Sequence, residues 1–225
     1  MFTALVWVGV LSGFGTDSFN HVSKYGLDYP LIVHFHALAF VGWLALFTVQ
    51  VALIRNARAD IHRRLGIFVF GLACVMVILG SMAATDLLRR GMAAQSVDAK
   101  TFYASSLGDI VIFGTLIFFA FRTRSNPAAH KRLILIATIT LLAAAINRWP
   151  FPIILREPIL ITLIDDAFLL PLVAYDLWST RKVHQATLWG GLFLVIMQQL
   201  ELPIGRTAVW QSFATWVLER TKTFH

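Results

Sequence analysis

The chain has 225 residues, of which 58% are hydrophobic and 14% are charged, and its formal net charge is +7. Soluble domains are about 45–50% apolar and about 25% charged, and a soluble domain of this size has too little interior to bury the excess. The composition therefore excludes a cytosolic enzyme, a disordered chain and, because Cys74 is the single cysteine, a disulfide-stabilised secreted domain.

Apolar segments recur along the chain, and most approach the roughly 20 residues that a helix needs to cross a bilayer. In chain order they cover about 1–16, 31–54, 65–85, 106–121, 133–149, 158–178 and 187–203. The first is short or tilted, so six spans is the alternative to seven. Because the apolar runs are continuous rather than alternating, helices are favoured over a barrel. We expect an all-α, polytopic transmembrane helix bundle that forms one domain over residues 1–225.

Basic residues are concentrated in three short connections, 55–64, 122–132 and 179–186. The positive-inside rule places such loops in the cytoplasm, which predicts a protein of the cell inner membrane with a cytoplasmic N-terminus. The positive charge then serves contacts with lipid headgroups, and no nucleic-acid partner is expected. Beyond the last span, residues 207–218 mix aromatic and polar side chains, as is typical of a helix lying on the outer membrane face.

The three basic connections share a pattern in which a histidine precedes the next span. These histidines are His62, His130 and His184. The pattern indicates three tandem helix hairpins, 31–84, 106–149 and 158–203, although the positive-inside rule alone also produces basic turns. The histidines are expected either to bind phosphate headgroups and cap helices, or to form a cytoplasmic cluster that holds a metal ion or a haem group.

Ionisable side chains lie within several of the predicted spans, where contact with lipid is unfavourable by several kcal/mol. They are expected near the outer ends of their helices, with Asp109 about three residues inside its span. We therefore expect them to turn inward and to meet in one polar pocket in the outer half of the bilayer. The candidate metal ligands in this pocket are His36, Asp109, Asp165, Asp166 and Glu201.

Helical spacing adds polar residues to this site. His36, Trp43 and Gln50 are seven residues apart and share one helix face, as do His184, Gly191 and Gln198 in the last span. The residues expected to contact a cofactor are His36, Trp43, Gln50, Arg148 and Gln198.

The charge of the predicted pocket is negative even after Arg148 is counted. A site of low dielectric constant does not accept such a charge, so either some carboxyl groups are protonated or a cation is bound there. The alternative is structural: Arg148 pairs with one aspartate, and the protonated carboxyls connect neighbouring helices.

Several motifs together resemble a family of uncharacterised bacterial multi-pass membrane proteins. They are His36-Ala37 with Gly42-Trp43 and Gln50, His62-Arg63-Arg64-Leu65-Gly66, Leu107-Gly108-Asp109, His130-Lys131-Arg132-Leu133, Tyr175-Asp176-Leu177 and His184 to Gly191. The His-Arg-x-Leu turn is also similar to membrane proteins that assist assembly of haem–copper oxidases, and more distantly to cytochrome b-type helical proteins. The latter have paired embedded histidines, whereas His36 has no counterpart at matched depth.

Three functions are compatible with these features. The first is binding of a metal ion or redox cofactor, with a role in membrane redox chemistry or oxidase assembly and a respiratory or other membrane complex as partner. The second is proton-coupled transport of a small solute, or a channel for one. The third is a structural subunit that docks through the outer aromatic helix.

Overall fold

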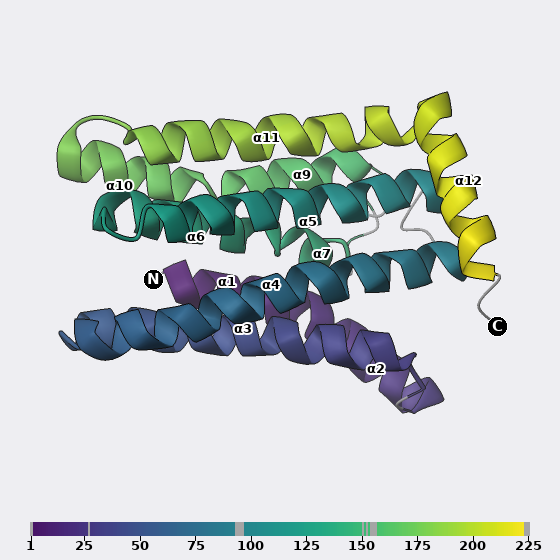
Figure 1. The fold of residues 1–225 in the computed structure, drawn as a ribbon, viewed down its shortest axis with the longest axis horizontal. Helices are drawn as coiled ribbons and strands as arrows, with labels where there is room; N and C mark the ends of the chain where they lie inside the picture. Colours follow the sequence, from purple (N-terminus) through teal and green to yellow (C-terminus); the bar gives the residue numbers. More distant parts are fainter. Residues whose placement is uncertain are drawn as a thin grey trace.

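The computed structural model describes residues 2–26, 28–92, 97–149, 151, 153 and 157–222. It is an all-α helix bundle, and the described part of the chain contains no strand (Figure 1). Its elements are α1 (Phe2–Val10), η1 (Leu11–Gly15), α2 (Thr16–Tyr25), α3 (Leu31–Arg55), α4 (Ala59–Arg89), α5 (Ala99–Arg122), α6 (Pro127–Thr140), α7 (Ala143–Ile146), α9 (Pro158–Ala167), α10 (Leu170–Thr180), α11 (Gln185–Gly205) and α12 (Ala208–Lys222).

Six helical segments of the described chain are long and apolar enough to cross a membrane, which identifies a multi-pass membrane protein. They are Phe2–Lys24, Leu31–Arg55, Ala59–Arg89, Ala99–Arg122, Pro127–Ile146 and Gln185–Gly205. The N-terminal segment is longer than the expected 1–16, whose first residue lies outside the described part, because η1 joins α1 to α2 without interruption. The expected span 158–178 is instead divided into two short helices.

The division of that segment has a local cause. Pro171 lies in the first turn of α10, where its missing backbone N–H cannot bond to the preceding turn. The chain between α9 and α10 forms tighter bonds instead, with the Leu169 N–H donating to the Asp166 carbonyl at 2.9 Å. The break follows Asp165 and Asp166 directly, so it lies beside two of the predicted site residues.

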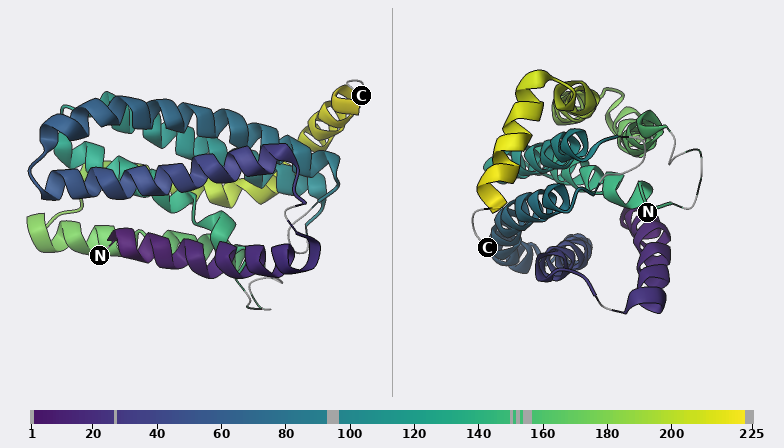
Figure 2. Two further views of the ribbon diagram at one scale, coloured as in Figure 1. Left: turned by 90° about the horizontal axis from the view of Figure 1, so that it is seen from below. Right: turned by 90° about the vertical axis from the view of Figure 1, so that its right-hand side faces the viewer.

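Helix α5 lies at the centre of the bundle, where it packs against α4, α6 and α11 (Figures 1 and 2). Helices α3 and α4 form one hairpin and α5 and α6 form the next, as the tandem pattern predicted. The core between them is apolar, with Ile112, Ile136 and Leu194 fully buried. Large apolar side chains on the outside, such as Phe68 and Leu38, are exposed and suit contact with lipid tails.

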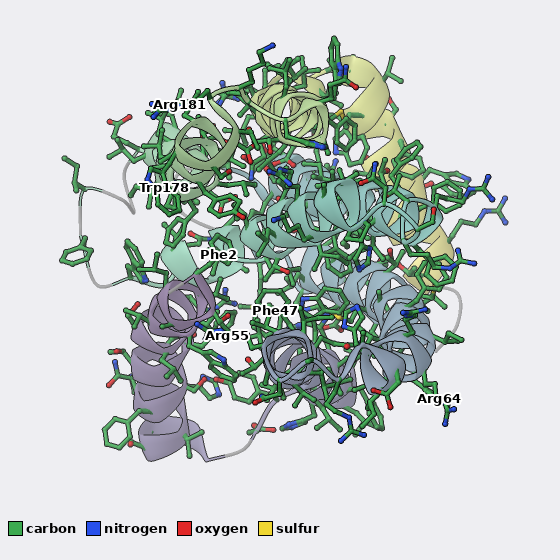
Figure 3. The ribbon with its side chains drawn as sticks, turned by 90° about the vertical axis from the view of Figure 1, so that its left-hand side faces the viewer. Phe2, Phe47, Arg55, Arg64, Trp178 and Arg181 are labelled. Carbon is green, nitrogen blue, oxygen red and sulfur yellow. The ribbon has the colours of Figure 1, made fainter. Side chains whose placement is uncertain are left out.

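The two ends of the bundle differ in character. Arg55, Arg64 and Arg181 all lie at one end, which we call the basic end (Figure 3). Helix α12 crosses the opposite end, which we call the α12 end (Figure 1). Phe2 faces the basic end, so the chain begins toward one side of the bundle and finishes at the other.

The expected helix at 207–218 is present as α12. Its inner side packs on α4 and α5, and Ala214 joins a small cluster with Ala84, Leu88 and Tyr103. Trp216 and Val209 remain exposed on its outer side. An apolar outer face at a bundle end fits a lipid headgroup region, and docking on a membrane complex through this face stays a prediction.

The N-terminus of α5 depends on Asp98. The Thr101 hydroxyl donates to its carboxylate at 2.6 Å, and the backbone N–H groups of Thr101 and Lys100 donate at 3.0 Å. These hydrogen bonds, the one from the Thr101 hydroxyl foremost, lower the pKa of Asp98 below its usual 3.8. Because this pKa is lowered, ionised Asp98 stabilises the folded state fully above pH 3.8. The stabilisation is lost as the pH falls through the pKa that Asp98 has in the folded state.

We therefore expect Asp98→Ala to reduce the free energy of unfolding by about 0.5–2 kcal/mol, as for other helix caps. Asp98→Asn, which retains a capping oxygen, should lose less and should remove this group's contribution to acid sensitivity. Unfolding in detergent, followed by circular dichroism between neutral and acidic pH, measures both effects. Equal stability of Asp98→Ala and the unmodified protein at neutral pH would contradict the capping role.

Candidate functional site: a buried carboxyl cluster

Three carboxyl side chains from three helices gather in the half of the bundle nearer the α12 end. They are Asp109 of α5, Asp165 of α9 and Glu201 of α11, which we call the carboxyl cluster. Asp165 is fully buried and Glu201 is 7% exposed. Because α5 begins at Ala99 rather than at residue 106, Asp109 lies about 15 Å along its helix, deeper than the expected three residues.

The members of the cluster are close enough to interact electrostatically. Glu201 interacts with both Asp109 and Asp165, and Asp165 interacts with Asp109. One polar neighbour supports the site, because the Gln198 side-chain amide donates to Asp165 Oδ2 at 2.8 Å.

Glu201 approaches α5 very closely. Its Oε1 atom lies over the backbone of Gly108, where an added Cβ would overlap the carboxyl group. Any larger residue at Gly108 would displace Glu201 from Asp109, the next residue on α5. The glycine therefore sets the separation of α5 and α11 at the site.

No ion pair formed by the described residues includes a member of the cluster. Arg148, the cation expected to compensate the charge, pairs instead with Asp17 at 3.2 Å in an exposed position and lies over the Phe14 ring. Arg132, at the basic end, pairs with Asp176. Two buried carboxylates and a partly buried third, without a countercharge, are strongly unfavourable in a low-dielectric interior, so the cluster must retain protons or bind a cation.

The remaining candidates near this end do not join the cluster to the same degree. Asp166 interacts electrostatically with Asp165 but is only half-buried. The ring of His36 packs over Gly80 of α4 beside Ile110. Within the described ranges, no three His, Cys, Asp or Glu side chains are arranged to hold a metal ion. The metal centre that the sequence suggested stays a prediction.

The other predicted residues lie toward the basic end. Trp43 and Gln50 are buried on the inner face of α3. The rings of His62 and His130 approach each other edge to face, with centroids 6.2 Å apart. His184 caps α11 by accepting a hydrogen bond from the Ala186 N–H at 3.0 Å. Two of the three basic-end histidines thus meet, and the third has the capping role that was the alternative.

Sequence reasoning missed two features of this architecture. The buried pair of Arg132 and Asp176 joins residues 44 positions apart, and Arg132 had been assigned to the headgroup region. The contact of Gly108 with Glu201 depends on how α5 and α11 cross.

Comparison of the chain with protein-family models, curated proteins and solved structures gave no match. Functional inference therefore depends on the residues of this chain.

Proposed function

We propose that this multi-pass membrane protein binds and releases protons at the carboxyl cluster and couples their movement to that of a small solute. The observation that carries the proposal is that Asp165 and Glu201 are buried and interact with the partly buried Asp109, while no basic side chain of the described residues pairs with any of the three. Intramembrane carboxyl groups in such positions mark proton and ion pathways.

The interrupted helices beside the cluster support the same proposal. Helix α9 ends two residues after Asp165, and α10 begins only after Phe168 and Leu169. Helix α6 is likewise interrupted before α7, and α7 packs against α9. Transporters place substrate and ion sites at such discontinuous helices, because the backbone groups freed at the break can bind ligand. The break between α9 and α10 begins two residues after Asp165, a member of the carboxyl cluster.

A metal or redox cofactor would require His36 and the carboxyl groups to share one site. The ring of His36 instead lies beside Gly80 of α4. Proton exchange, by contrast, uses the groups that do lie together. Proton exchange also accounts for the position of Gln198 beside Asp165, because a side-chain amide can donate to a carboxylate or accept from a protonated carboxyl group.

Infrared spectroscopy of the purified protein in lipid tests proton binding directly. We expect absorption from protonated carboxylic acids at neutral pH, and we expect Glu201→Gln and Asp165→Asn each to reduce it. Asp60→Asn is the matched control, because Asp60 is exposed and pairs with Arg58 at the basic end. Absence of this absorption in the unmodified protein, or its persistence in both variants, would contradict the proposal.

Liposomes that contain a pH-sensitive dye test proton movement. A potassium gradient with valinomycin supplies the membrane potential, and a panel of small amines, carboxylates and sugars supplies candidate solutes. We expect proton flux in the unmodified protein and in Asp60→Asn. In Glu201→Gln the flux should fall to that of protein-free liposomes, since Gln cannot exchange a proton at this position.

A further inference from the structure

A cavity of about 80 Å3 lies toward the basic end, between α3, α4, α5 and α6. Figure 3 views this end and labels Phe47, which lines the cavity and points into the bundle. Most of the wall is apolar or aromatic, but four residues from α3, α4 and α6 present polar groups. The polar wall residues are Trp43, Gln50, His62 and His130.

Three polar atoms of these wall residues have no hydrogen-bond partner among the described residues. They are Trp43 Nε1, Gln50 Oε1 and His62 Nδ1. Trp43 is 1% exposed and Gln50 is 9% exposed, so bulk solvent does not reach them. Leaving one such atom without a partner costs about 1–3 kcal/mol. The indole N–H can only donate and the amide oxygen can only accept, so the occupant must do both.

The size of the cavity selects the occupant. A water molecule occupies about 30 Å3, and a cavity that binds benzene measures about 150 Å3. A volume of about 80 Å3 therefore suits two or three water molecules and is small for an aromatic ring. Water also supplies both the donor and the acceptor that Trp43 and Gln50 require.

The two histidines of the wall are placed to exchange protons through such water. His130 Nδ1 lies 2.8 Å from the Ala120 carbonyl and donates to it, which leaves Nε2 of the neutral ring to accept a proton. The ring of His62 on α4 faces the ring of His130 on α6. Helix α3 presents the uncharged Gln50 to it, α5 presents Phe121, and the nearest fixed charge is Arg63 on α4.

Two cations next to His130 in the chain are already engaged. Arg132 is paired with Asp176, and Lys131 donates to the Tyr175 hydroxyl at 3.2 Å. The imidazole is the side chain that changes charge near neutral pH.

We propose that this cavity is a second proton-binding site, in which a small water cluster held by Trp43 and Gln50 connects His62 with His130. A protein that moves protons must exchange them on both sides of the membrane. The carboxyl cluster serves the α12 end, and this cavity serves the basic end. In that respect the inference rests on the proposed function, although occupancy of the cavity is measured independently of it.

Nuclear magnetic resonance of protein labelled with 15N-Trp and 15N-His in detergent micelles tests the proposal. Trp43→Phe identifies the Trp43 indole signal. We expect magnetisation transfer from water to the Trp43 indole proton and to the ring N–H protons of His62 and His130. If water transfer to Trp43 is absent while the carboxylic acid absorption is present, only the cavity proposal is overturned. If the transfer is present while the absorption is absent, only the proposed role of the carboxyl cluster is overturned.

Gly66→Val is the decisive variant, because Gly66 lines the cavity and a Cβ there would lie 3.7 Å from Gln50 Nε2, an ordinary contact. The added side chain should displace the water and remove the transfer to Trp43. Gly71→Val is the matched control on the same helix, where a Cβ meets nothing within 4 Å. If Gly66→Val does not fold, Gln50→Leu removes the acceptor instead and should weaken the same signal.

Two results would overturn the proposal. The first is the absence of transfer from water to Trp43 in the unmodified protein, especially if xenon shifts the Trp43 signal, since dry apolar cavities bind xenon. The second is an undiminished signal in Gly66→Val or Gln50→Leu.

Discussion

Asp176→Asn is expected to lower the free energy of unfolding by about 3–5 kcal/mol, the usual effect of breaking a buried ion pair. Asp176 is fully buried, and Arg132 is 2% exposed. The Arg132 guanidinium donates to Asp176 Oδ1 through Nη2 and, at 2.9 Å, through Nε. Asn has the same shape but no charge, so the arginine would remain buried without its counterion.

Asp176 also joins α10 to α11, which adds to the expected effect. Its Oδ2 atom accepts from the Thr187 hydroxyl at 2.6 Å and from the His184 N–H at 3.0 Å. One carboxylate therefore satisfies donors from α6, from the turn after α10 and from α11. Losing it should loosen the basic end as a whole, because these helices meet there.

Reversible unfolding in mixed micelles, followed by circular dichroism, measures the effect of Asp176→Asn. Asp60→Asn is the control: it breaks an ion pair with Arg58 whose side chains are 56% and 63% exposed, and such pairs contribute about 0–1 kcal/mol. The double variant Arg132→Met with Asp176→Leu should recover much of the stability, since apolar replacements of buried pairs are often neutral or better. Equal losses in Asp176→Asn and Asp60→Asn would contradict this account.

Gly13→Ala is expected to be the second most damaging substitution, at about 1–3 kcal/mol for the overpacking. A Cβ at Gly13 would overlap the backbone carbonyl group of Ala145. Backbone cannot rotate away as a flexible side chain can, so η1 and α7 would have to separate. The neighbouring hydrogen bond from the Trp149 indole to the Gly9 carbonyl, at 3.3 Å, would be lost with that contact.

Gly15→Ala is the matched control in the same π-helical turn. A Cβ at Gly15 meets nothing within 4 Å, and alanine is favoured over glycine in a helix by about 0.5–1 kcal/mol. The control should therefore be neutral or more stable. Unfolding midpoints of the two variants give the comparison, and a Gly13→Ala midpoint at or above that of Gly15→Ala would show that α7 does not hold the N-terminal helix as described.

Much of the fold was predictable because each apolar segment carries its own signal. Helices such as Leu31–Arg55 and Gln185–Gly205 were anticipated to within a few residues. The errors occurred where a polar stretch continued a helix. The segment 99–105 extends α5, and residues 17–25 extend the N-terminal helix, because Asp98 and η1 provide local backbone connections that hydropathy does not register.

The sequence by itself determined that this protein lies in a membrane and that its carboxyl groups must turn away from lipid, because hydrocarbon solvates neither a backbone nor a charge. Only the tertiary structure decided which groups meet. Arg148 pairs with Asp17 and Arg132 pairs with Asp176. Asp109, Asp165 and Glu201 lie together in the carboxyl cluster. The reason is geometric: pairing depends on how helices cross and on close approaches such as Gly108 to Glu201, which no spacing along one helix specifies.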